Sequence, residues 1–191
     1  LSNVNDIQVD SEHLMVISPD EGGTSRAVYL ANVLGVDMGM FYKRRDYTKV
    51  INGRNPIVAH EFLGSNVEGK DVLVIDDMIS SGESMIDVAR KLKALHAKRI
   101  FLYSTFGLFT NGMEKFDEAY KEGLFYRVLT TNLVYQTPDL LSRPYYICVD
   151  LSKYIALIID TLNHDMSVSH LLNPADRIKK CVNNYMAQYD K

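Results

Sequence analysis

Hydrophobic positions along this chain follow two alternating patterns. Short apolar runs predict β-strands, and longer stretches with apolar residues three and four positions apart predict amphipathic helices. The expected strands are residues 13–18, 38–41, 57–63, 71–75, 98–104, 125–132 and 145–149. The expected helices are residues 24–34, 84–96, 113–121 and 151–163, with Pro174 at the start of a last one.

The order of these elements predicts the fold class. Strand–helix–strand units favour an α/β fold with a mostly parallel, twisted sheet and helices on both faces. Residues 71–75 are apolar without alternation, which is typical of a strand covered on both faces. Because no repeat or linker composition divides the chain, we expect residues 1–191 to form a single domain with a helical tail at 173–191.

Composition narrows the function classes. The chain has 191 residues, 47% of them hydrophobic and 24% charged, which suffices for a folded core. A net charge of −3 argues against a general binder of nucleic acid or membrane surfaces, and the apolar run 154–159 is too short to cross a bilayer. Cys148 and Cys181 form neither a disulfide framework nor a zinc motif, so we expect a cytoplasmic protein.

Ligands of parallel sheets bind beyond the carboxyl ends of the strands, so the segment after residue 75 is the first place to look. Asp76 and Asp77, the acid pair, repel each other and need cations or hydroxyl groups as partners. The 80–84 segment that follows offers serine hydroxyls and backbone N–H groups at a helix N-terminus, which suits a phosphate. A pentose 5-phosphate would satisfy both ends. The alternative is that Asp77 and the serines only cap the helix.

The loop at residues 18–23, here the Asp20 loop, is the second candidate. Gly22 and Gly23 allow the backbone to approach an anion closely, and Asp20 provides a hard oxygen ligand of the kind that Mg²⁺ prefers. The alternative is an ordinary strand-to-helix turn in which Asp20 is the cap.

Residues 43–54, the basic segment, are the third candidate. This window of 12 residues holds five cations, opposed only by Asp46: they are Lys43, Arg44, Arg45, Lys49 and Arg54. Such a local excess in an acidic chain favours an anionic partner, although charge runs are often solvated faces. A mobile basic arm over a triphosphate would neutralise charge during phosphoryl transfer, which needs little covalent chemistry from the protein.

Taken together, these segments resemble the ribose-phosphate pyrophosphokinases, also called phosphoribosyl pyrophosphate synthetases. Residues 76–84 resemble the motif D-D-M-I-D-T-G-G-T, with Ser80 in place of an acid and Glu83 in place of a glycine. The Asp20 loop resembles S-P-D-x-G-G, and residues 43–45 resemble K-R-R. Residues 167–172 resemble S-V-S-x-L-F, so that the similarity extends from about residue 14 to residue 172.

The resemblance implies a type I phosphoribosyltransferase-like fold and a Mg²⁺-dependent reaction. ATP would transfer its pyrophosphoryl group to the C1 hydroxyl of ribose 5-phosphate, giving phosphoribosyl pyrophosphate and AMP. It also implies residue roles, with Lys43 and Arg45 acting on the transferring phosphates and Asp20 lying near the metal ion. The pyrophosphate would contact Asp20, Gly22 and Gly23. Ribose 5-phosphate would contact Asp76, Asp77, Ser80, Ser81, Gly82, Glu83 and Ser84.

Synthetases of this family have two such domains, so the resemblance implies that this chain is the C-terminal domain of a longer enzyme. A start at Leu1-Ser2-Asn3 rather than at Met agrees with that expectation. The resemblance further implies a homo-oligomer, either dimer-based or hexameric, and low activity for this domain alone. Two alternatives stay open: a non-catalytic regulatory subunit that binds sugar phosphate, and a type I phosphoribosyltransferase.

Overall fold

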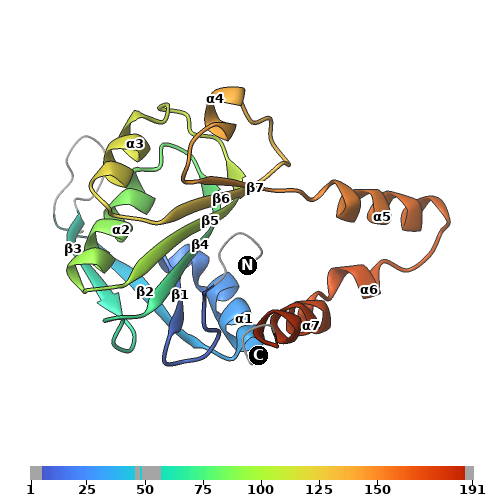
Figure 1. The fold of residues 1–191 in the computed structure, drawn as a ribbon, viewed down its shortest axis with the longest axis horizontal. Coiled ribbons are helices and arrows are strands. Elements are labelled where there is room, and N and C mark those ends of the chain that lie inside the picture. The colour runs from blue at the N-terminus through green and yellow to red at the C-terminus, as the bar shows by residue number, and fades with distance from the viewer. Residues whose placement is uncertain (1–5, 46–47, 49–56, 188–191) are drawn as a thin grey trace.

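The computed structural model describes the backbone of residues 6–45, 48 and 57–187, and the side chains of these residues except 43–45 and 57–60. These residues form a seven-stranded sheet with the strand order β3-β2-β1-β4-β5-β6-β7 (Figure 1). The strands are β1 (Leu14–Ser18), β2 (Asp37–Arg45), β3 (Ile57–Leu63), β4 (Asp71–Ile79), β5 (Arg99–Gly107), β6 (Arg127–Thr131) and β7 (Tyr146–Val149). The helices are α1 (Thr24–Leu34), α2 (Glu83–Ala94), α3 (Glu114–Lys121), α4 (Pro138–Leu141), α5 (Ser152–Asn163), α6 (Ser169–Leu172) and α7 (Ala175–Met186).

The sheet is parallel except at one edge, where β3 runs antiparallel to β2. This arrangement confirms the predicted α/β class with a mostly parallel sheet. Three predicted strand ends are wrong. β5 continues from residue 104 to Gly107. β4 continues through the acid pair because Met78 and Ile79 pair with Phe106 and Gly107 of β5, and β2 continues through residues 43–45 because it pairs with β3.

Alternate residues of the central strand β4 fill two separate cores. Val72 and Val74 pack with residues of α2 and α3, including Phe116, on one face of the sheet. Ile75 packs with Ala27 of α1 on the opposite face. Figure 1 shows the same division, with α2 and α3 on one side and α1 on the other.

The last three helices lie apart from this layered body. After β7, α5 extends away from the sheet, α6 turns back, and α7 lies beside α1 (Figure 1). The Tyr185 hydroxyl of α7 accepts a hydrogen bond of 2.9 Å from the backbone N–H of Ile7, which joins the two ends of the described chain. No helix among the described residues combines the length and apolar character needed to cross a bilayer.

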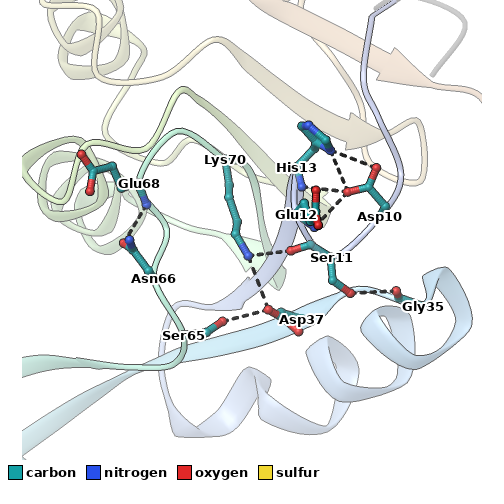
Figure 2. Close-up of polar contacts among 10 residues, drawn as sticks. All are labelled: Asp10, Ser11, Glu12, His13, Gly35, Asp37, Ser65, Asn66, Glu68 and Lys70. Carbon is teal, nitrogen blue, oxygen red and sulfur yellow. Dashed lines mark hydrogen bonds and ion pairs between the residues drawn. The ribbon is translucent and has the colours of Figure 1, made fainter.

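A polar network fixes the amino ends of the strands, at the edge of the sheet away from the candidate site (Figure 2). The ammonium of Lys70, just before β4, donates to the carbonyl of Ser11 at 2.6 Å and pairs with the Asp37 carboxylate at 3.4 Å. The Ser65 hydroxyl donates to the same carboxylate at 2.9 Å. These contacts connect the segments that lead into β1, β2 and β4, and they involve no residue at the carboxyl ends of these strands.

Candidate functional site

The topology brings the predicted segments to one edge of the sheet. β1 lies between β2 and β4, so the carboxyl ends of all three strands are neighbours. A Cβ atom added to Gly23 in the Asp20 loop would lie 3.5 Å from the carbonyl oxygen of Ile75, directly before the acid pair. The Asp20 loop and the acid pair are therefore parts of one site.

The Asp20 loop is a compact turn stabilised by its own carboxylate. Asp20 Oδ1 accepts hydrogen bonds from the backbone N–H groups of Gly22 at 2.9 Å and Gly23 at 3.3 Å. A Cβ atom at Gly23 would approach the Ser18 hydroxyl to 2.6 Å, so this close turn requires glycine. Asp20 therefore caps the short helical turn that follows it, as the alternative interpretation expected. Its half-buried carboxylate also lies close enough to Asp76 for its charge to help raise the pKa of Asp76.

The two members of the acid pair differ in environment. The Asp76 side chain is 21% exposed, and its Oδ1 accepts hydrogen bonds from the Asp77 backbone N–H at 2.8 Å and from Arg26 Nη2 at 3.0 Å. The Asp77 side chain is 61% exposed and lies 3.5 Å from the same Arg26 nitrogen. Burial raises the pKa of Asp76, and the charges of Asp77 and Asp20 add to this effect. Asp77 is therefore the member better placed to meet a ligand from solvent.

Sequence reasoning missed Arg26. It lies in the first turn of α1, where the helix dipole favours acidic rather than basic side chains. A cation placed against the helix dipole indicates that a negative group lies nearby. In the structure that group is the acid pair, which Arg26 contacts. Within the described part of the chain, the buried Nε of Arg26 has no hydrogen-bond partner.

The 80–84 segment forms a tight turn that leads directly into α2. Gly82 precedes the helix in the left-handed conformation (φ 80°), and α2 begins at Glu83, one residue earlier than predicted. The carbonyl of Ser80 accepts a hydrogen bond of 3.0 Å from the backbone N–H of Thr110, which anchors the turn to the loop after β5. The N–H groups of the first turn of α2 have no intrahelical acceptors, and that of Glu83 donates to the Ser81 hydroxyl at 3.5 Å. A helix N-terminus of this kind suits a phosphate.

Glu83 is the residue whose charge opposes phosphate binding in this segment. Its carboxylate accepts a hydrogen bond from the ammonium of Lys115 in α3, and this contact lowers the pKa of Glu83. The Glu83 side chain is 59% exposed, so its carboxylate lies at the solvent side of the 80–84 segment. Sequence reasoning did not identify Lys115.

The basic segment is described only in part. The backbone of Lys43 and Arg45 lies in β2, where Lys43 pairs with His60 of β3 and the register shifts between Arg44 and Arg45. Their side chains, and residues 46–47 and 49–56, lie outside the described residues. The roles assigned to Lys43 and Arg45 therefore stay predictions.

A cavity of about 680 Å³, which the sequence did not predict, adjoins the acid pair. It lies between α1 and the sheet, with Arg26 and Asp76 among its lining residues, and its other walls are mostly apolar, including Leu73, Phe101 and Leu129. An apolar cavity next to a few charged groups is a common form of ligand site.

The described residues hold no group of three or more His, Cys, Asp or Glu side chains arranged to bind a metal ion by themselves. Mg²⁺, however, is commonly held by one or two carboxylates together with substrate phosphates and water. Asp20 and the exposed Asp77 fit that requirement, because both offer carboxylate oxygens at the open edge of the sheet.

Comparisons with known proteins show the family to which the chain belongs. The family model described as "Phosphoribosyl transferase domain" matches residues 2–140. The ribose-phosphate pyrophosphokinase of Vibrio cholerae is 30% identical over 163 residues, which cover 85% of this chain and 49% of that protein. That of Mycoplasma genitalium is 31% identical over 157 residues, which cover 82% of this chain and 45% of that protein.

The fold is also similar to that of a solved structure. The crystal structure of phosphoribosylpyrophosphate synthetase from Mycobacterium smegmatis matches with a TM-score of 0.66 and 22% identity, over 80% of this chain and 45% of that one. The chain spans about half the length of the curated relatives it matches. Because the family model covers more than half of its residues, the chain belongs to the phosphoribosyl transferase domain family.

Proposed function

We propose that this chain is part of an enzyme that transfers the pyrophosphoryl group of ATP to ribose 5-phosphate. The observation that supports this most is the continuous run from the acid pair at the end of β4 to the first turn of α2. One end of that run suits sugar hydroxyls and the other suits a phosphate. The similarity to proteins named ribose-phosphate pyrophosphokinase supports the reaction type.

The reaction would join the C1 hydroxyl oxygen of ribose 5-phosphate to the β-phosphorus of ATP. The bond between this phosphorus and the oxygen that bridges it to the α-phosphate breaks, the hydroxyl proton is lost, and AMP leaves. The 5-phosphate would be held by backbone N–H groups of the 80–84 segment and by the dipole of α2. Asp77 would accept hydrogen bonds from the ribose hydroxyls, and Arg26 would keep Asp76 oriented beside them.

The pyrophosphate moiety would lie against the Asp20 loop, where Gly22 and Gly23 permit close approach of the backbone. Mg²⁺, the proposed cofactor, would neutralise phosphate charge when bound, and the Asp20 carboxylate is its proposed ligand. We also propose a homo-oligomeric, dimer-based or hexameric assembly in the cytoplasm.

The test is formation of AMP from ATP, ribose 5-phosphate and magnesium by the full-length protein and by this chain. We expect AMP only when ribose 5-phosphate is present. The proposal would be contradicted if AMP formed equally fast without ribose 5-phosphate, or if the full-length protein formed no AMP. Binding of ribose 5-phosphate without turnover would instead favour a regulatory subunit, for which Ser80 and Glu83 are the supporting residues. Consumption of phosphoribosyl pyrophosphate with a nucleobase would indicate a phosphoribosyltransferase.

Replacement of Lys43 tests the proposed role of the basic segment. Lys43→Ala in the full-length protein should lower turnover by about 100-fold or more, as loss of a charge-stabilising donor usually does. The affinity for ribose 5-phosphate should stay nearly unchanged, because that ligand is assigned to the 80–84 segment and the acid pair. Arg44→Ala is the matched control, since this neighbouring cation has no assigned role. Equal turnover in the Lys43→Ala and Arg44→Ala variants would contradict the assignment.

A further inference from the structure

The helix α3 forms one side of the 80–84 segment. The α2 and α3 helices lie beside each other on the same face of the sheet (Figure 1). The ring of Phe116 occupies the place where a Cβ atom of residue 82 would be, since such an atom would lie 2.1 Å from the ring. Lys115, the preceding residue of α3, is thereby brought to Glu83 at the first position of α2.

Glu83 poses an electrostatic problem for a phosphate site. A carboxylate in the first turn of a helix is favoured by the helix dipole, and a phosphate bound at the same turn uses the same favourable field. The two negative groups would repel each other, because like charges at short range are unfavourable. A phosphate is therefore easier to accommodate if a nearby cation cancels the charge of Glu83.

Lys115 is the cation that contacts Glu83. The two side chains are 55% and 59% exposed, so both lie at the open rim of the 80–84 segment rather than in the core. An exposed ion pair of this kind contributes little to the stability of the fold. Because this ion pair lies where the phosphate would bind, it matters for the affinity of the ligand rather than for the stability of the fold.

We propose that Lys115 determines the phosphate affinity of this site by cancelling the charge of Glu83 at the start of α2. The inference rests on the proposed function, because it requires the phosphate of the substrate to bind at the 80–84 segment. In this proposal α3 takes part in substrate binding through Lys115, which supplies a positive charge that neither the acid pair nor the Asp20 loop has.

The test is a set of four full-length proteins titrated calorimetrically with ribose 5-phosphate at low ionic strength: the wild type, Lys115→Met, Glu83→Gln and the double variant. Lys115→Met should weaken binding about threefold to fivefold, the range expected for one exposed charge. Glu83→Gln should bind as tightly as the wild type or more tightly. The double variant should return close to the wild-type affinity, and the differences should shrink in high salt.

The control is Arg90→Met, which removes an ion pair of 3.8 Å between Arg90 of α2 and Glu122 near the other end of these two helices. It should leave the affinity for ribose 5-phosphate unchanged. If wild type binds and Lys115→Met binds equally well, or if the double variant is no better than Lys115→Met, the inference is wrong and the proposed function stands. If wild type does not bind ribose 5-phosphate, both are wrong.

Discussion

At the scale of a single residue, Asp76 places a carboxylate in surroundings that disfavour its charged form, which lowers the free energy of unfolding. Its carboxylate is largely buried beside Asp77 and near Asp20, and these surroundings raise its pKa. The pKa is raised although Arg26 Nη2 lies 3.0 Å from Asp76 Oδ1. Titratable groups with such perturbed environments concentrate at functional sites.

Replacement of Asp76 should therefore stabilise the fold. Because the pKa of Asp76 in the folded protein lies above its ordinary value of 3.8, the folded state binds a proton more tightly than the unfolded state. Ionisation at higher pH consequently lowers the free energy of unfolding. Asp76→Asn should raise that free energy by about 1 kcal/mol at neutral pH, a gain typical of substitutions that relieve a functional site. The gain should fade as the pH falls and vanish well below pH 3.8, where Asp76 is protonated in both the folded and the unfolded state.

Urea denaturation at neutral and acidic pH measures this effect. Asp77→Asn is the comparison variant: its side chain is 61% exposed, and it removes only one of the charges that raise the pKa of Asp76, so it should stabilise the fold by less than Asp76→Asn does. A loss of stability in Asp76→Asn at neutral pH would show that the contact with Arg26 outweighs the cost of burial.

The strand β4 shows, at the scale of the element, where sequence patterns stop being informative. The apolar run 71–75 predicted the beginning of this strand correctly, and the two aspartates that follow it suggested a loop. The strand nevertheless continues to Ile79, because β5 offers hydrogen-bonding partners as far as Gly107. Strand ends depend on pairing with distant segments, which local composition does not specify.

Gly82 at the start of α2 allows a sharp prediction at this scale. Gly82→Ala would place a methyl group 2.1 Å from the ring of Phe116 and would hold alanine in a left-handed conformation. Conformational strain and overpacking together should cost about 3 kcal/mol of unfolding free energy. Gly123→Ala is the matched control, since Gly123 has a φ of 70° and an added Cβ would have no neighbour within 4 Å.

The control should lose only about 1 kcal/mol, which is the conformational part alone. Denaturant titration of both variants separates the two contributions. Equal losses in both would show that the ring of Phe116 moves aside without cost.

The whole molecule determines the parts of the site that the sequence did not reveal. The acid pair, Gly22, Gly23 and the 80–84 segment could be predicted because each is a short, continuous motif next to a strand end. The contacts of Arg26 with Asp76 and of Lys115 with Glu83 join residues 50 and 32 positions apart. Such contacts follow only from the order of the strands and the packing of helices on them.

Arg99 connects the segment before β1 to the sheet. Its guanidinium contacts both carboxylate oxygens of Asp71, at 2.8 and 2.6 Å, and the carboxylate of Asp6 at 2.6 Å. The side chains of Arg99 and Asp71 are 14% and 4% exposed, so their pair is largely removed from solvent. The Asp6 side chain, by contrast, is 69% exposed.

Loss of Arg99 should destabilise the whole fold. Arg99→Met would leave the Asp71 carboxylate buried without its cation, which should cost about 3–5 kcal/mol of unfolding free energy. Asp6→Asn, which affects only the exposed partner, should cost less than about 1 kcal/mol. Equilibrium denaturation measures both, and a loss below about 1 kcal/mol for Arg99→Met would contradict the structural role assigned to this ion pair.

The ring of Phe116, which fills the space that a side chain at position 82 would need, has a consequence for the history of the protein. Position 82 has no room for a side chain while the ring at position 116 stays in place. A lineage that acquires a side chain at position 82 must first lose the ring at position 116, and glycine at position 82 can be replaced only after that loss. The turn that precedes α2 and the helix α3 are therefore constrained to evolve together.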